Sequence, residues 1–354
     1  MGEHKYAELA QKLRGDILAG VYAGGQKLPS ENELAEQTGY SRSTVRQAVS
    51  LLEQEGLANR VRGSGTYVRS AIPNREPTRN IAVVTTYIGE YIFPIFLHGI
   101  DHVLSKNGYT SMLGATRNRV DNERRILSDL LEKPIDGMIV EGTKTAFPNP
   151  NIDLYERFSE RGIPVVFING YYPDLKSPVF VVADDRAGGR MACSALLQKG
   201  HQKIAGIFKS DDIQGHRRYQ GYAEALRSAG LAVADDHVIW YDTENRGNIL
   251  EARAAPALRG CTAAVCYNDE TALLTLEILE KSGDPARQKV DFVSFDHSTF
   301  ARLSATPFLS LSISQENMGR LAAKKLLKLL EFQKEPPSVL QWEIEPEDRP
   351  LFGK

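Results

Sequence analysis

The chain has 354 residues, which suits two or three domains rather than one. Hydrophobic residues make up 42% of it and charged residues 25%, a globular composition. No run approaches the roughly 20 apolar residues that cross a bilayer, and the N-terminus lacks an apolar signal core, so we expect a cytoplasmic protein that does not bind membranes. The net charge of −2 means that any surface for nucleic acid must be local.

The metal-binding residue types are sparse and scattered. The three cysteines, Cys193, Cys261 and Cys266, fit a reducing compartment and are expected to be small buried side chains. His201 and His297 have no second ligand at metal spacing and are interpreted as structural. The sequence therefore predicts no metal site and no other cofactor.

Residues 28–57, LPSENELAEQTGYSRSTVRQAVSLLEQEGL, predict two helices joined by a tight turn. Ser30 and Glu33 have the spacing of a capping box, which starts a short helix that runs from residue 31 to about residue 37. Gly39 permits the turn, and Ser41 can cap a second helix from Arg42 to Glu55. This arrangement is a helix-turn-helix.

The second helix has one apolar face and one polar face. Its apolar positions recur at helical spacing and predict a small core, namely Val45, Ala48, Val49 and Leu52. The outward residues are Arg42, Ser43, Arg46, Gln47 and Ser50, and the two arginines lie one turn apart and can reach base edges or phosphates. Ser43 and Thr44 can contact phosphates at the start of the helix. In isolation, Arg42 and Arg46 could equally be solvated surface residues.

Residues 56–68, GLANRVRGSGTYV, predict a hairpin directly after the second helix. Residues 57–61 and 66–68 read as its strands, and the glycines between them supply the positive φ that a tight turn needs. Arg62 and Gly63 at the tip are placed to meet a minor groove or a phosphate, although an ordinary hairpin has the same pattern. We interpret residues 1–69 as a DNA-binding winged helix of the α+β class.

The stretch LPSENELAEQTGYSRSTVRQAVSLLEQEGL together with RGSGTYV resembles the headpiece of the GntR family of bacterial regulators. The resemblance implies that Arg42, Ser43, Thr44, Arg46, Arg62 and Gly63 contact DNA, and that Ser30 and Glu31 lie near phosphates. Many members carry an arginine directly after the Ser-Glu pair, whereas this chain has Asn32. A double-stranded operator is therefore the expected partner, bound by a homodimer because one such head contacts few bases.

Residues 70–79, SAIPNREPTR, read as a linker, and residues 80–354 alternate short apolar runs with amphipathic segments. Such alternation predicts βαβ units with a parallel sheet, and their number exceeds one sheet, so we expect an α/β core of two lobes with a cleft between them. The predicted strands are 80–86, 109–113, 136–142, 164–170, 179–184, 203–209, 263–268 and 291–296. The predicted helices include 122–131, 188–199, 215–229 and 270–281.

Ligands of open α/β sheets bind beyond the C-terminal ends of the strands. Those ends carry Thr86 and Tyr87, Glu141, Asp184 and Asp185, Lys209 and Asp211, Asn268 and Asp269, and Asp296. Carboxylate, amide and cationic groups beside an aromatic surface are what a sugar requires, and Tyr91 and Phe93 could supply that surface. The sequence leaves other interpretations open: Asp185 or Asp269 as a helix cap, Glu141 with Lys209 as an ion pair, and Tyr91 with Phe93 in the core or a dimer surface.

Past the linker the chain is similar to the core of LacI/GalR regulators, which itself resembles periplasmic sugar-binding proteins. The matching segments include DGMIVEG, ADDRAGGRMACSALLQKGHQKIAGI, RYQGYAEAL, CYNDETAL and VSFD. By this resemblance Arg218, which opens an Arg-x-x-Gly segment, is a ligand-binding arginine. Asp296 remains a ligand candidate, although His297 departs from the Asp-Asp pair of many relatives.

A GntR-like head on a LacI-like core, together with the segments YIFP, DNERR, VEGTK, KSDDIQG and YNDE, resembles the arabinose-responsive repressors. This implies a transcriptional repressor with L-arabinose as effector, bound by Tyr91, Phe93, Glu141, Lys209, Asp211, Arg218, Asn268, Asp269 and Asp296. Another pentose, a hexose or a nucleobase is the alternative effector, and the sequence does not reveal whether the effector releases or promotes DNA binding. A sugar receptor without a regulatory role is the alternative class. We do not expect an enzyme, because no nucleophile elbow, P-loop or metal cluster is present.

Overall fold

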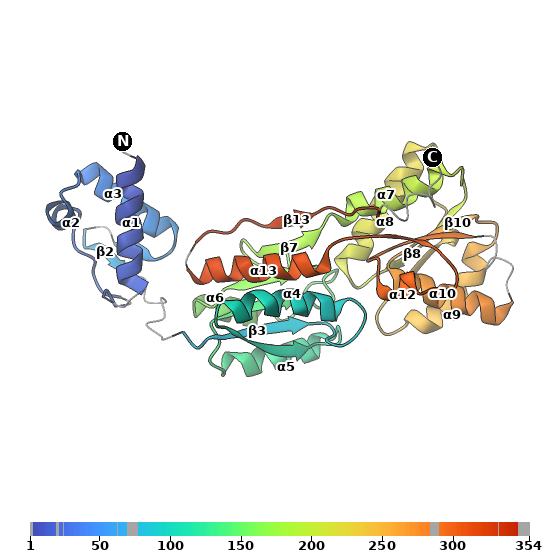
Figure 1. Cartoon of the computed structure of the whole chain (residues 1–354), viewed down its shortest axis with the longest axis horizontal. Coiled ribbons are helices and arrows are strands. Elements are labelled where there is room, and N and C mark those ends of the chain that lie inside the picture. The colour runs from blue at the N-terminus through green and yellow to red at the C-terminus, as the bar shows by residue number, and fades with distance from the viewer. Residues whose placement is uncertain are drawn as a thin grey trace.

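The computed structural model describes residues 3–18, 21–23, 25–61, 63–68, 77–283, 290–331 and 333–345. The N-terminal part is a helical head with a two-stranded antiparallel hairpin (Figure 1). Its elements are α1 (Glu3–Leu18), α2 (Glu31–Thr38), α3 (Arg42–Gln54), β1 (Ala58–Val61) and β2 (Gly65–Val68).

The local sequence signals of the head act as predicted. The Ser30 side chain accepts from the Glu33 amide while the Glu33 carboxylate accepts from the Ser30 amide, and Ser41 caps α3. The predicted apolar face of α3 is fully buried against α1, α2 and the hairpin, which confirms the expected small core. Gly39 ends α2 at a φ of 70°, a conformation that glycine adopts without strain.

The larger part contains two parallel sheets, each covered by helices, in two lobes (Figure 1). The sheet of the N-lobe has the strand order β13-β7-β6-β5-β3-β4. Its strands are β3 (Asn80–Thr85), β4 (Thr110–Ala115), β5 (Gly137–Glu141), β6 (Val165–Ile168), β7 (Val179–Ala183) and β13 (Ser338–Leu340). The helices of this lobe are α4 (Phe93–Lys106), α5 (Val120–Leu131), α6 (Ile152–Glu160) and α13 (Gln315–Leu330).

The sheet of the C-lobe has the strand order β12-β11-β10-β8-β9. Its strands are β8 (Ile204–Lys209), β9 (Val238–Tyr241), β10 (Ala263–Cys266), β11 (Asp291–Phe295) and β12 (Leu309–Leu311). Its helices are α7 (Asp185–Gln198), α8 (Ile213–Ser228), the short 3-10 turn η1 (Asp235–His237), α9 (Arg246–Leu258), α10 (Asp269–Ser282) and α12 (Thr299–Arg302). All eight predicted strands are confirmed, whereas β9, β12 and β13 were not predicted.

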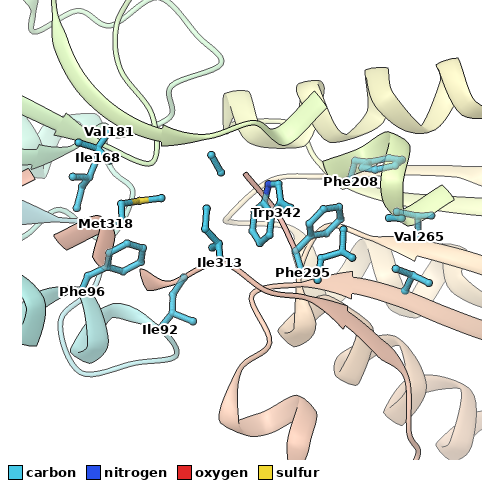
Figure 2. Close-up of a cluster of buried hydrophobic side chains, with 14 of the residues drawn as sticks. Ile92, Phe96, Ile168, Val181, Phe208, Val265, Phe295, Ile313, Met318 and Trp342 are labelled. Atoms are coloured by element: carbon cyan, nitrogen blue, oxygen red, sulfur yellow. The ribbon is translucent and has the colours of Figure 1, made fainter. Parts of the chain in front are cut away.

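The chain passes between the lobes at three crossovers, which follow β7, β12 and β13. The segment of the third crossover lies beside that of the second, because Glu343 and Ser312 form an antiparallel bridge. One cluster of buried hydrophobic side chains runs from Phe96 and Met318 in the N-lobe, through Ile313 and Trp342, to Phe295 and its neighbours in the C-lobe (Figure 2). The crossovers are thus part of a continuous apolar core. No helix within the described ranges combines the length and the apolar character needed to span a bilayer.

Helices α7 and α8 pack at unusually short range because each carries glycine at the contact. A Cβ on Gly189 of α7 would overlap the carbonyl oxygen of Arg218, and a Cβ on Gly221 of α8 would overlap that of Arg186. Backbone atoms cannot give way as a flexible side chain can, so any larger residue must push the helices apart. The two glycines therefore fix where Arg218 enters the space between the lobes.

We expect Gly189→Ala to lower the free energy of unfolding by about 1–3 kcal/mol, because the added methyl group overpacks a backbone contact. Gly247→Ala in α9 is the matched control, since nothing lies within 4 Å of its added Cβ and alanine favours a helix. Urea denaturation of both variants measures the difference. Equal stability of the two would show that the glycine contact is not a packing constraint.

Candidate binding cavity and nucleic-acid interface

A cavity of about 190 Å³ lies where both lobes and the crossovers meet. A single water needs about 10–15 Å³ by this measure, so the space suits a small polar molecule. Seven of the nine sequence-predicted ligand residues line it: Tyr91, Phe93, Glu141, Lys209, Arg218, Asn268 and Asp296.

Arg218 is buried at the wall of the cavity, with its guanidinium surrounded by aromatic rings. Its Nε donates to Asp185 Oδ1 at 2.8 Å, and one Nη donates to the carbonyl of Tyr267. The guanidinium carbon lies 4.3 Å from the ring centre of Phe295 and 4.9 Å from those of Tyr267 and Trp342, within the range of cation–π attraction. Burial raises the pKa of Asp185 although the neighbouring Arg218 opposes the shift.

Glu141 and Lys209 both reach the cavity but do not pair with each other. Glu141 accepts from the amide and hydroxyl of Thr86 at 2.8 and 2.6 Å and from Asn169 at 2.8 Å. Burial still raises the pKa of Glu141. Lys209 pairs instead with Asp212 and, at 3.4 Å, with Asp211. The predicted alternative of a Glu141–Lys209 ion pair is therefore wrong.

Tyr91 and Asp296 form a hydrogen bond from the N-lobe to the C-lobe. The Tyr91 hydroxyl donates to Asp296 Oδ2 at 2.6 Å. Burial raises the pKa of Asp296 to about 7, against the opposing charge of Arg218. Both residues have positive φ, 54° for Tyr91 and 93° for Asp296, conformations that cluster at functional sites. Phe93 lies at the first turn of α4 with its ring 5.6 Å from that of Tyr87.

The structure does not bring Asp211 and Asp269 to the cavity wall. The Asp269 carboxylate turns inward, where it accepts from the hydroxyls of Ser294 and Ser310 and from the Ser298 amide. Asp211 is buried and accepts from Thr243 Oγ1 at 2.7 Å.

Asp185 and Asp269 were also considered as helix caps, but the residue before each of them takes that role. Asp184 caps α7 and Asn268 caps α10, rather than Asp185 and Asp269. Asn268 thus has both roles, since its Oδ1 caps the helix while the residue lines the cavity.

The cavity also contains polar residues that the sequence did not single out as ligands. Asp185 was considered as a strand-end group and as a helix cap, and Asp212 directly follows a predicted residue. The others lie in loops or in the first turn of a helix: Glu90, Asn118, Asn169, Gln214, Thr243, Arg246, Glu270 and Gln315. No group of three or more His, Cys, Asp or Glu side chains in the described ranges is arranged to hold a metal ion.

The outward face of the head carries the predicted arginines. Arg42 and Arg46 are exposed on α3, together with Ser43 and Gln47, while Thr44 is half-buried. Ser30 is exposed at the start of α2, and Gly63 has a φ of 79° in the hairpin turn. Arg62 lies outside the described residues.

Glu31 holds two arginines on this face. Its carboxylate pairs with Arg46 at 3.0 Å and with Arg60 of β1 at 2.8 Å, and Arg60 also pairs with Glu53 at 3.2 Å. The hydrogen bond from Arg46 lowers the pKa of Glu31, with burial opposing. Glu31 was predicted to lie near phosphates, and in the structure its carboxylate pairs with both Arg46 and Arg60. Arg60 was not among the predicted contacts, because the prediction rested on the second helix and the hairpin tip, whereas Arg60 lies on the strand β1.

Comparisons with known proteins match both parts of the chain. Residues 5–68 match the model of bacterial regulatory proteins of the gntR family, and residues 193–349 match a periplasmic binding protein-like domain. The chain is 35% identical to an arabinose metabolism transcriptional repressor of Halalkalibacterium halodurans, over 95% of this chain and 92% of that protein. It is 36% identical to a protein of the same name from Geobacillus stearothermophilus, over 92% and 91%.

Among solved structures, a complex of the transcriptional regulator CelR with cellobiose has the same fold. The TM-score is 0.67 at 24% identity, covering 90% of this chain and 98% of that one. This likeness bears on the fold alone.

We expect Arg218→Met to lower the free energy of unfolding by about 3–5 kcal/mol, because it leaves the buried Asp185 carboxylate without its cation. Arg186→Met is the matched control, since Arg186 also pairs across α7 and α8, with Glu224, but is exposed. Its loss should leave stability nearly unchanged. Adding Asp185→Asn to Arg218→Met should restore part of the loss. Denaturant unfolding measures all three variants against the wild type, and equal effects of the two arginine substitutions would contradict the buried-pair interpretation.

Proposed function

Because this chain belongs to the family of arabinose metabolism transcriptional repressors, we propose that it represses transcription by binding operator DNA and that L-arabinose controls this binding. The head holds the DNA, and the cavity between the lobes holds the sugar. The observation that carries the proposal is the presence, in one chain, of a gntR-type head and a polar cavity with aromatic walls.

The proposed DNA interface is the N-terminal end of α3 with the hairpin beside it. Arg42 and Arg46 reach base edges in the major groove, and Gln47 lies on the same face. Ser43, Thr44 and Ser30 contact phosphates near helix N-termini, where backbone amides favour an anion. Gly63 in the hairpin turn, with Arg62 before it in the sequence, meets the minor groove or the DNA backbone. Glu31 keeps Arg46 extended toward the DNA, which lowers the ordering cost of the contact.

The cavity offers both donors and acceptors at fixed positions, as a ring of vicinal hydroxyl groups requires. A guanidinium has five N–H donors, and Arg218 uses two of them on Asp185 and Tyr267, which leaves others for hydroxyls. Asn268 and Lys209 add donors, while Glu141 and Asp296 add acceptors. The aromatic rings beside Arg218 and the ring of Phe93 present apolar surface to the C–H faces of a sugar.

The charges of the cavity favour a neutral ligand over an anionic one. Six carboxylate side chains line it, against the three cations Lys209, Arg218 and Arg246. All three cations already pair with protein carboxylates: Lys209 with Asp212, Arg218 with Asp185 and Arg246 with Glu270. A phosphate group would meet an excess of negative charge, so we propose the free sugar as the effector and not its phosphate ester.

We further propose that two copies bind one operator, because one winged helix contacts too few bases for useful specificity. Sugar binding favours one arrangement of the lobes, which lowers the affinity of the paired heads for DNA. A ligand shifts such an equilibrium only by its difference in affinity between the two states, and 1–3 kcal/mol is typical. L-arabinose thus acts as an inducer.

The test is a fluorescence-anisotropy titration with an operator duplex that the protein selects from a random library. L-arabinose at saturation should weaken operator binding about tenfold or more. D-xylose, D-galactose, cellobiose and a pentose phosphate are the comparison ligands, and calorimetry measures their affinities directly. If L-arabinose left operator affinity unchanged and another sugar of the panel bound tightly, that other sugar would be assigned as the effector in place of L-arabinose.

We expect Arg46→Ala to weaken binding to the selected operator about tenfold or more, because it removes a bidentate contact to a base or phosphate. Arg125→Ala, which removes an equally exposed arginine from α5, should leave operator affinity unchanged. Glu31→Gln should have an intermediate effect, since it frees Arg46 and Arg60 without removing either. Anisotropy at fixed salt measures all three variants, and an equal loss for Arg125→Ala would mean that the effect is not one of the interface.

A further inference from the structure

A second set of polar contacts joins the lobes at one side of the cavity. Lys144, in the loop after β5, reaches across to Glu244, in the loop after β9. Its Nζ lies 2.7 and 2.9 Å from the two carboxylate oxygens. Neither residue lines the cavity. We name this group the clasp, and it consists of Asn118, Lys144 and Thr145 of the N-lobe with Asp211, Thr243 and Glu244 of the C-lobe.

Asn118 is the central residue of the clasp. Its side-chain amide donates across the lobes to Thr243 Oγ1 at 2.7 Å and to Asp211 Oδ2 at 3.2 Å. Its carbonyl oxygen accepts from the Lys144 amide at 2.8 Å, within the N-lobe. One buried side chain therefore joins the loop that carries Lys144 to the C-lobe.

Two backbone amides also cross between the lobes in the clasp. The Ala146 amide donates to the carbonyl of Asp211 at 3.2 Å, and the Ile213 amide donates to Thr145 Oγ1 at 3.1 Å. These bonds form only at one separation of the lobes, because hydrogen bonds weaken steeply with distance and angle. They therefore report directly on whether the lobes are closed.

The N-lobe side of the clasp is built rigidly. Glu123 is fully buried and accepts from four side chains, which fix the loop that follows β5. These donors are Asn149, Asn151, Tyr155 and Tyr172, at 2.6–2.8 Å. The Tyr172 hydroxyl in turn accepts from the Thr143 amide, one residue before Lys144.

The backbone at the clasp is held in a rarely populated conformation. Asn118 and Lys144 have backbone φ values of 52° and 45°, which residues other than glycine seldom adopt. Such conformations persist only where surrounding contacts over-determine them. The residues that reach across the cleft are thus the ones whose backbone is constrained.

We propose that the clasp holds the lobes in the closed arrangement, with Lys144 and Glu244 as positioning residues that raise effector affinity without touching the effector. This inference rests on the proposed function, because it assigns the clasp to the sugar-binding cavity. The clasp connects to that cavity through Lys209, which pairs with Asp211, and through Asn118, which lies on its wall. Closure around a ligand and formation of the clasp are then one event.

The test uses charge reversal in the full-length protein: Lys144→Glu, Glu244→Lys and the double exchange. Each single reversal should weaken L-arabinose binding about five- to thirtyfold in calorimetry, and the double exchange should restore it to within about twofold. Lys281→Glu is the matched control, since the exposed Lys281 pairs with Glu277 within α10, away from the cavity and the clasp, and should leave affinity unchanged.

Hydrogen exchange of the peptides containing Ala146 and Ile213 provides a readout that does not depend on the sugar. Both amides should exchange faster in the single reversals and return to the wild-type rate in the double exchange, while Lys281→Glu has no effect. Wild-type sugar affinity and exchange rates in the single reversals would overturn the clasp. If the wild-type protein did not bind L-arabinose but exchange still responded as expected, the clasp would stand and the effector assignment would fail.

Discussion

The buried pair of Arg218 and Asp185 is the interaction on which the arrangement of the core depends. Arg218 comes from α8 and Asp185 is the first residue of α7, directly after the crossover from β7. The glycine contact between these helices brings the two charges together, and the ring of Trp342 on the third crossover covers the guanidinium. A buried charge is tolerated only when it is paired, so these segments must stay in register. A ligand that hydrogen-bonds to Arg218 therefore acts on a group already linked to two crossovers.

Much of the fold could be predicted because its signals are local. Strands such as 80–86 and 203–209 are short apolar runs between helical patterns, and burial on both faces of a parallel sheet requires such a composition. The cap at Ser30 and the apolar spacing on α3 likewise depend on residues within one or two turns. The strands β9, β12 and β13 were missed because they have only three or four residues and all three lie at sheet edges.

The candidate site was predicted less completely, for a geometric reason. The sequence locates strand ends, but it does not determine which of two adjacent polar residues faces the cavity. Asp269 follows Asn268 directly and points inward to three serines, while Asn268 takes both the cap and the cavity. In the same way Asp212 rather than Asp211 lines the cavity. Asn118 lies in a loop and Gln315 is the first residue of α13, directly after a crossover, and no periodicity signals that either one faces the cavity.

Two kinds of contact join the lobes, and their physical difference explains how one core can have two states. The cluster around Ile313, Met318 and Trp342 is apolar (Figure 2). Apolar burial is non-directional, so neighbouring side chains can shift while remaining in contact. The clasp and the bond between Tyr91 and Asp296 are directional, and each is either formed or broken. An apolar hinge combined with polar contacts of this kind favours two discrete arrangements over a continuous range, which is what a switch requires.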